Sequence, residues 1–285
     1  MKNKKHSSTD KTTSVANIKY YGLGLLSGVV LMGVVALSTS GGRAVAREFV
    51  MNITTAIKHI FSDGTTLPVA KYYGIDVSRY QADIDWEKVK DIRYNKLSRR
   101  QGLDEVSQVE ISFVACKATE GSSHKDSHLA SNRDGVRDNG LIYGAYHVMS
   151  IDSEAQKQVN NFHKTAKLHK GDMLPIIDLE ESILGKYKPS DVRKKLSEIV
   201  SAMAKKYGSK PIIYCGEKFA QKLELSKYYA ENPQWRARYG SKGEKNKEAD
   251  IWQFSETGEV EGIKTMVDLD AFCSAKYELK DLLIK

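Results

Sequence analysis

Short apolar runs alternate with amphipathic stretches from residue 71 to the end of the chain. The first five runs have the length of strands and cover residues 73–77, 111–116, 141–148, 173–179 and 211–215. Between them, apolar positions spaced along one helix face predict helices over 127–138, 153–168 and 191–207. For the third helix we expect Ser190 as the N-cap and Gly208 as the stop.

The helical pattern fades after residue 230. Three more strand-like runs follow, at 235–239, 251–254 and 266–269. Alternating strands and helices predict parallel strands joined by right-handed crossovers, and five such units followed by three strands are enough to close a barrel. We therefore predict an α/β barrel over 71–285. The polar stretch 91–110 is predicted to be an insertion loop or a helix extension on its surface.

A different pattern precedes the barrel. Residues 20–39 contain no charged residue and are apolar on every face. A helix of that length spans about 30 Å, the thickness of the hydrocarbon core of a bilayer. Five lysines precede it and two arginines follow within eight residues, which predicts a single transmembrane helix with a basic cytoplasmic tail at 1–19 and the barrel outside. Residues 40–70 then form a stem. A cleaved signal peptide is the alternative, because Ala44-Val45-Ala46 has the form of a cleavage site.

Charge and cysteine content exclude several classes of function. Residues 1–70 carry eight basic and three acidic side chains, so they supply most of the formal net charge of +8. The nearly balanced barrel gives no electrostatic case for binding nucleic acid. Three cysteines without a C-x-x-C pair argue against a disulfide framework and a zinc site, and Cys116 and Cys215 are interpreted as buried thiols. His147 has no partner at ligand spacing, so we expect no metal and no cofactor.

Four carboxylates fall at or just past predicted strand ends: Asp76, Asp178, Glu180 and Asp268. The carboxyl ends of parallel barrel strands converge on one face, which carries the chemistry. Asp178 and Glu180 alternate along one strand, so both are expected to face one cavity, about 6–7 Å apart, a range in which two carboxyl groups flank a glycosidic bond. We expect Asp178 and a partly dry cleft to raise the pKa of Glu180. The alternative is two solvated acids in a loop.

Aromatic residues near the same strand ends favour a sugar ligand, because aromatic faces stack on sugar rings. They are Tyr146, Tyr214, Trp235, Tyr239 and Trp252, with His147 beside them. Core packing is the alternative for each of them, and it is the preferred interpretation for Trp235.

Taken together, these residues resemble glycoside hydrolase family 25, the Chalaropsis-type lysozymes. The motifs that carry the resemblance follow in family order over about 72–281: Gly74-Ile75-Asp76-Val77-Ser78 with Gln81 and Ile84-Asp85-Trp86, Phe113 with Lys117-Ala118-Thr119-Glu120-Gly121, Gly144-Ala145-Tyr146-His147, Asp178-Leu179-Glu180, Ile213-Tyr214, Trp235-Arg236-Ala237-Arg238-Tyr239, Trp252-Gln253 and Val267-Asp268. Asp270 stands where the last motif leads us to expect Asn, and the stretch 91–110 is longer than the family's usual link.

The resemblance implies a modified TIM-like (β/α)5(β)3 barrel that hydrolyses the β-1,4 bond between N-acetylmuramic acid and N-acetylglucosamine in peptidoglycan, as a monomer without a cofactor. It implies Glu180 as the general acid, with Asp178, Asp76 and Asp268 lining the cleft. Either Asp178 or the substrate's own 2-acetamido group is the nucleophile, and the resemblance favours the acetamido group. The expected substrate contacts are Gln81, Lys117, Glu120, Tyr146, His147, Tyr214, Trp252 and Gln253. Two other functions stay open: hydrolysis of another N-acetylated glycan such as chitin, and a catalytically silent wall-binding module.

Overall fold

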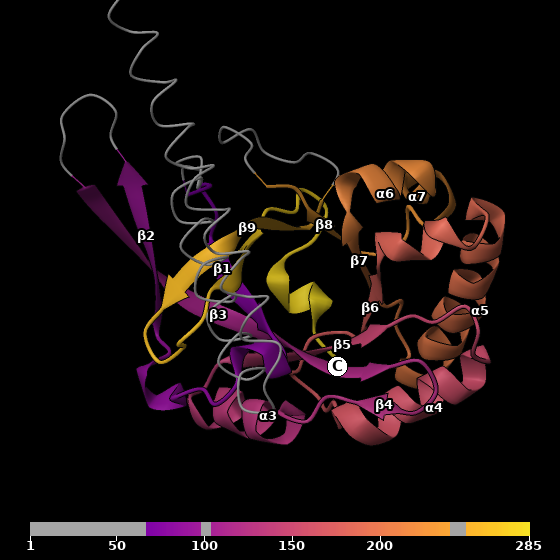
Figure 1. Ribbon diagram of the computed structural model, residues 1–285, viewed down its shortest axis with the longest axis horizontal. Coiled ribbons are helices and arrows are strands. Elements are labelled where there is room, and N and C mark those ends of the chain that lie inside the picture. The colour runs from indigo at the N-terminus through magenta and orange to yellow at the C-terminus, as the bar shows by residue number, and fades with distance from the viewer. Residues whose placement is uncertain (1–66, 98–103, 240–248) are drawn as a thin grey trace, which may run out of the picture. The chain divides into compact units, whose positions relative to one another are not determined.

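The computed structural model describes residues 67–97, 104–239 and 249–285 (Figure 1). The predicted cytoplasmic tail, the apolar span 20–39 and nearly all of the stem lie outside these residues. Within the described ranges, no helix combines the length and the apolar character that crossing a bilayer requires.

Strands and helices alternate through most of the described chain. Their bounds are β1 (Tyr72–Val77), β2 (Asp91–Leu97), β3 (Asp104–Glu120), β4 (His124–Lys125), α3 (Leu129–Asp138), β5 (Ile142–Val148), α4 (Ala155–Ala166), β6 (Ile176–Leu179), α5 (Pro189–Tyr207), β7 (Ile212–Gly216), α6 (Glu217–Lys222), α7 (Leu225–Tyr228), β8 (Gln234–Ala237), β9 (Ile251–Val260) and β10 (Val267–Phe272). Short 3₁₀ helices cover Arg79–Gln81, Trp86–Lys88, Glu181–Gly185 and Leu279–Leu282.

The strands close into a barrel. Parallel pairing runs from β1 through β3, β5, β6, β7 and β8 to β9. Antiparallel pairs of β9 with β10 and of β10 with β1 complete the ring. The helices α3, α4 and α5 lie outside it (Figure 1). The predicted order of five strands followed by three is therefore present, with the last strand reversed. That reversal brings the amino end of β10 to the rim formed by the carboxyl ends of the other strands.

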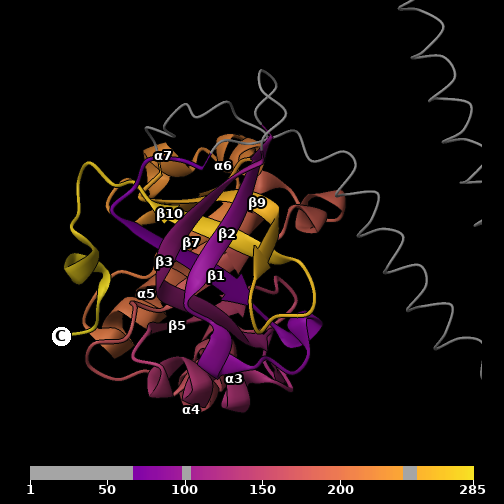
Figure 2. The same cartoon turned by 90° about the vertical axis from the view of Figure 1, so that its left-hand side faces the viewer.

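The described parts of the stretch 91–110 form strands, so the prediction of a loop or a helix extension is wrong for them. Its two ends pair as an antiparallel hairpin, from Asp91 opposite Glu110 to Leu97 opposite Asp104. β2 also pairs with β9, through Ile92 opposite Val260. Figures 1 and 2 show β2 and the first part of β3 side by side as an arm that extends from the barrel. Backbone hydrogen bonds across the hairpin, rather than an apolar repeat, define these strands.

The three predicted helices match α3, α4 and α5 closely, with one correction at an N-terminus, whereas α6 and α7 were not predicted. α5 begins at Pro189 after the N-cap Lys188, so Ser190 is not the cap. Proline suits the first helical position, because its fixed φ is helical and its missing N–H is not needed there. The helix ends as expected at Gly208, whose φ of 71° is left-handed and whose N–H donates to the carbonyl oxygen of Ala204.

Large side chains fill the barrel below its rim. Phe113, Met173, Ile176, Ile212 and Trp235 belong to this inner cluster and are all buried. Gly74 makes room for them, because a Cβ atom there would lie 2.2 Å from the Phe113 ring. Alternate residues of a strand face the same side, so Gly74 places Asp76 on the inner face one step nearer the rim. The packed interior thus forms the floor of a site.

Candidate active site

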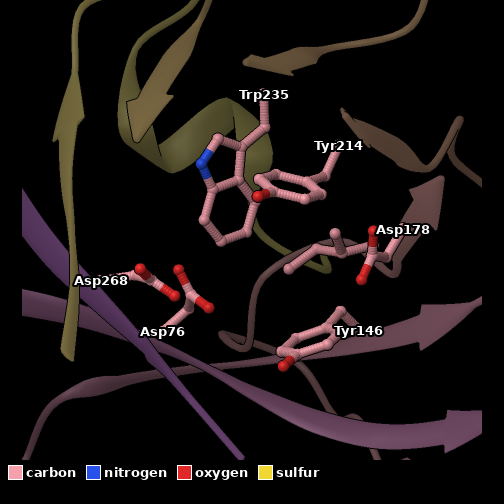
Figure 3. Close-up of a pocket in the computed structure, with 7 residues that line it drawn as sticks. Asp76, Tyr146, Asp178, Tyr214, Trp235 and Asp268 are labelled. Atoms are coloured by element: carbon pink, nitrogen blue, oxygen red, sulfur yellow. The ribbon is translucent and has the colours of Figure 1, made fainter. Parts of the chain in front are cut away.

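A cavity of about 150 Å³ opens at the rim of the barrel (Figure 3). It is lined by Asp76, Tyr146, Ile176, Asp178, Tyr214, Trp235 and Asp268. Asp76, Tyr146, Asp178 and Tyr214 come from β1, β5, β6 and β7. Asp268 comes from the amino end of the reversed β10, which explains how it joins them. The structure therefore brings three of the four predicted catalytic acids together with two of the predicted substrate contacts.

The three carboxyl groups stand on two sides of the cavity. Figure 3 shows Asp76 and Asp268 beside each other, with Asp178 across from them and the rings of Tyr146, Tyr214 and Trp235 between. Tyr214 and Trp235 meet edge to face, with ring centroids 5.1 Å apart. Trp235 is thus both a packed core residue, as we expected, and part of the cavity wall. Carboxyl groups facing one another across aromatic rings suit a ligand that has polar groups and apolar faces, such as a sugar.

Hydrogen bonds hold Asp76 in place. Gln253 Nε2 donates to Asp76 Oδ2 at 2.6 Å. Gln253 Oε1 in turn accepts from the hydroxyl groups of Tyr214 at 2.7 Å and Tyr239 at 2.5 Å. Gln253 is buried. The predicted substrate contact Gln253 therefore lies on the inner face and orients Asp76, although it is not part of the cavity lining.

Burial shifts the protonation of two cavity acids. Desolvation raises the pKa of Asp76 to about 7, and the hydrogen bond from Gln253 opposes that rise. Desolvation also raises the pKa of Asp178 to about 8, with the negative charge of Glu180 adding to it. Burial favours the neutral form of a carboxyl group because a charge is poorly solvated there. Asp76 and Asp178 are thus two cavity acids that burial holds partly in the neutral form near neutral pH.

Glu180 lies apart from the cavity lining. β6 ends at Leu179, and Glu180 precedes the 3₁₀ helix Glu181–Gly185. Its side chain is exposed, and its Oε2 accepts from Ser182 Oγ at 3.4 Å. The cavity lining thus includes Asp178 and not Glu180, although the two carboxyl groups lie close enough for the charge of Glu180 to raise the pKa of Asp178. The two-residue alternation holds only inside a strand, and Glu180 is already beyond its end.

Two predicted substrate contacts point away from the cavity. His147 is buried, its ring nitrogens contact Thr119 Oγ1 at 2.8 Å and Gln158 Oε1 at 3.0 Å, and burial lowers its pKa to about 4. Trp252 is also buried, and its Nε1 donates to the carbonyl oxygen of Arg238 at 2.9 Å. Their neighbours Tyr146 and Gln253 occupy the inner face, so alternation turns His147 and Trp252 outward.

The remaining predicted contacts lie outside the cavity lining. Lys117 Nζ donates to Glu120 Oε2 at 2.9 Å, where the carboxylate is half exposed. Gln81 caps the 3₁₀ helix that follows Ser78, and its Nε2 donates to the carbonyl oxygen of Met266 at 3.1 Å. Gln81 therefore ties the loop after β1 to the segment before β10.

Sequence reasoning missed two residues of the site. Ile176 forms part of the lining, and its position two residues before Asp178 on β6 is a signal that places it on the inner face. Asp270 was noted as a departure, but nothing indicated that it is completely buried beside Asp76. Among the residues that the structure describes, no group of three or more His, Cys, Asp or Glu side chains is arranged to hold a metal ion.

Comparisons with known proteins show the family to which the chain belongs. The sequence model of glycosyl hydrolases family 25 matches residues 75–263. The chain is 35% identical over 210 residues to the uncharacterized protein YegX of Escherichia coli K12, covering 73% of this chain and 72% of that one. It is 28% identical over 202 residues to the autolytic lysozyme of Clostridium acetobutylicum, covering 70% of this chain and 55% of the relative.

Solved structures show the same fold. A family 25 glycosyl hydrolase from Bacillus anthracis matches with a TM-score of 0.62 and 26% identity, over 76% of this chain and 96% of that one. A bacterial lysozyme from Streptomyces coelicolor matches with a TM-score of 0.61 and 23% identity, over 74% of this chain and 96% of that one. The predicted α/β barrel is thereby confirmed.

Proposed function

We infer the function from one premise: the chain belongs to glycosyl hydrolases family 25 and is a glycoside hydrolase. We propose that it is a lysozyme that hydrolyses the β-1,4 bond between N-acetylmuramic acid and N-acetylglucosamine in peptidoglycan. The observation that carries the proposal is the rim cavity, in which Asp76, Asp178 and Asp268 surround aromatic rings. Likeness to proteins named autolytic lysozyme and lysozyme M1 supports this choice of substrate.

Glu180 is the proposed general acid. It stands beside the cavity residue Asp178 at the end of β6, and its exposed side chain has room to turn toward a bound glycan. In the first step Glu180 gives its proton to the leaving oxygen as the glycosidic bond breaks. In the second step the carboxylate of Glu180 takes a proton from the water that attacks the anomeric carbon. This restores the acid for the next cycle.

The proposed nucleophile is the carbonyl oxygen of the substrate's own 2-acetamido group. It bonds to the anomeric carbon as the leaving oxygen departs, and water later displaces it. The pKa of Asp178, raised to about 8 by burial, supports this choice. Near neutral pH most Asp178 side chains are then protonated, and a protonated carboxyl group is a poor nucleophile. It still accepts a hydrogen bond from the acetamido N–H and so orients that group.

The aromatic wall is proposed to hold the sugar ring. Burial raises the pKa of the Tyr146 and Tyr214 hydroxyl groups well above their ordinary value, so both stay neutral in the working range. Both rings line the cavity, where they are placed to contact a substrate together with Trp235. Lys117 and Glu120, paired nearby on β3, are proposed to contact a longer glycan.

Product analysis tests the substrate. Incubation with purified peptidoglycan should release fragments whose new reducing ends are N-acetylmuramic acid, because that residue precedes the bond cleaved. Chitin should give far fewer reducing ends under the same conditions. Preferential cleavage of chitin would make the enzyme a hydrolase of another N-acetylated glycan. Binding to walls without any new reducing end would make the barrel a wall-binding module.

We further propose that residues 20–39 anchor a monomeric enzyme in the membrane with the barrel outside. The uncharged span and the lysines before it support this orientation. Tethering would keep the barrel near the wall and raise its local concentration there.

Fractionation tests the anchor. Full-length protein should stay with membranes after a high-salt wash, and external protease should remove the barrel from spheroplasts. A version that starts at residue 67 should be soluble, monomeric in sedimentation and still lytic. It keeps Pro68 and Ala70, which hydrogen-bond to the hydroxyl group of Tyr73. A native protein that begins near Arg47 and is found free outside the cytoplasm would instead establish cleavage after Ala46.

A further inference from the structure

Asp270 is a completely buried carboxyl group inside the barrel. It lies on β10, opposite Gly74 of β1 and Gln253 of β9. Trp235 Nε1 donates to Asp270 Oδ1 at 2.9 Å. The other oxygen, Oδ2, is buried and receives no hydrogen bond from the described residues. If Asp270 were ionised, leaving Oδ2 buried without a hydrogen-bond donor would cost free energy of folding. The charge state of Asp270 therefore needs an explanation.

The groups around Asp270 are mostly acidic. The carboxyl group of Asp76 on β1 lies within hydrogen-bond reach of the Asp270 carboxyl group, so a proton on either acid could join them, and Asp268 lies two residues away on β10. Asp178 of β6 faces Asp76 from across the cavity, and the hydroxyl groups of Tyr214 and Tyr239 point to Gln253. An ionised Asp270 would therefore meet negative charge from both β1 and β10. Two carboxyl groups this close are stable when they share a proton.

We propose that Asp270 is a neutral carboxylic acid that donates a hydrogen bond to the carboxylate of Asp76 and thereby positions Asp76 in the cavity. A proton on Oδ2 satisfies the buried oxygen and supplies a donor to Asp76. Asp76 then receives one hydrogen bond from Gln253 and one from Asp270. Burial raises the pKa of Asp270 well above that of an ordinary carboxyl group, and the charges of Asp76 and Asp268 raise it further.

This role makes the site depend on pH. An asparagine at this position would accept from Trp235 and donate to Asp76 at every pH. Asp270 does both only while it is protonated. As the pH rises and Asp270 ionises, the donor to Asp76 is lost and a negative charge is added beside Asp76 and Asp268. For catalysis, this inference rests on the proposed lysozyme activity, since only an active enzyme has a rate to lose.

Two substitutions test the role in catalysis. Asp270→Asn preserves the shape and the donor, so it should extend activity to higher pH than the wild type. Asp270→Leu removes the donor to Asp76 and the acceptor for Trp235, and the misplaced Asp76 should lower kcat by about 10–10²-fold. A purely structural role would change both variants without moving the alkaline limb of the pH–rate profile. An unmoved limb in Asp270→Asn would therefore overturn the inference.

Thermal unfolding tests whether Asp270 is protonated, and it does not depend on enzyme activity. Folding raises the pKa of Asp270. The neutral form therefore contributes its full stabilisation to the folded state below about pH 4, the pKa of a carboxyl group in the unfolded chain. That contribution is lost as the pH rises toward the pKa in the folded state. Asp270→Asn escapes that loss, so its Tm minus the wild-type Tm should increase with pH.

Asp250→Asn is the matched control for this measurement. Asp250 is buried in the same barrel, but it accepts from neutral donors, the backbone N–H of Gln234 at 2.8 Å and the hydroxyl group of Ser274. Its Tm difference should not grow in the same way. A growing difference for Asp270→Asn in a protein that fails to cleave peptidoglycan would keep this inference and reject the proposed function. A Tm difference that stays constant with pH, in a protein that does cleave peptidoglycan, would reject this inference and keep the proposed function.

Discussion

Glu180→Gln is expected to remove nearly all lytic activity and to leave the fold intact. The amide has almost the same shape as the carboxyl group, but it cannot give a proton to the leaving oxygen. Loss of a general acid typically lowers the rate by about 10²–10⁴-fold. The side chain is exposed and accepts one long hydrogen bond, from Ser182 Oγ at 3.4 Å, so stability should hardly change. The measurement is the rate of reducing-end release from purified peptidoglycan, with the Tm as a check of folding.

The neighbouring residue provides a control. Glu181 is also exposed, and its Oε1 accepts from Lys222 Nζ at 2.6 Å, which holds it on the α6 side. Glu181→Gln should therefore cleave peptidoglycan at close to the wild-type rate. If Glu180→Gln kept more than about a tenth of that rate, the assignment of the general acid would be wrong, because the loss would be too small for such a role.

The barrel could be predicted because its strands have a local signature. Most of them contain a short apolar run, and the three predicted helices between them show one apolar face. The predicted start of a strand is wrong where apolar residues enter the core before the strand begins to pair with its neighbours. Met173 and Leu174 are buried ahead of β6, and Met173 forms only an isolated bridge to Leu283. The apolar run therefore starts earlier than the strand.

The arm formed by β2 and β3 could not be predicted in the same way. Its sequence is polar and has no clear period of two, so nothing local distinguishes it from a loop. Its strands are defined by pairing across a hairpin and by the contact of Ile92 with Val260, far along the chain. Such pairing depends on backbone geometry that only the folded barrel supplies.

The sequence predicted those site residues whose positions follow from strand geometry alone. Asp76, Asp178 and Asp268 end or begin strands at one rim, and the barrel brings them together. We predicted both Tyr146 and His147 in the site. Neighbouring residues of a strand face opposite sides, so His147 cannot face the cavity when Tyr146 does. Asp270 pairs with Gly74 on the neighbouring strand β1 and accepts from Trp235 of β8, and both partners are far from it in sequence, so no local pattern shows its burial.

Asp178→Asn is expected to lower kcat by about 10²–10³-fold, a smaller loss than removal of a nucleophile would cause. If the acetamido group attacks the anomeric carbon, the asparagine oxygen still accepts a hydrogen bond from the acetamido N–H. What it lacks is the ionised form that a minority of Asp178 side chains adopt near neutral pH, whose negative charge balances the positive charge that develops on the sugar. If Asp178 attacked directly, the substitution would abolish the reaction, with a loss on the order of 10⁶-fold. Single-turnover rates on peptidoglycan separate these outcomes.

Two further measurements decide between the routes for the wild-type enzyme. A glycan with a free amino group in place of the 2-acetamido group on the sugar that is attacked should resist cleavage, because it lacks the attacking oxygen. Mass spectrometry of the acid-quenched reaction should find Asp178 unmodified. A sugar ester on Asp178, or undiminished cleavage of the deacetylated glycan, would establish direct attack. The pKa of about 8 would then have to fall when substrate binds, since only the ionised carboxylate of Asp178 can form that ester.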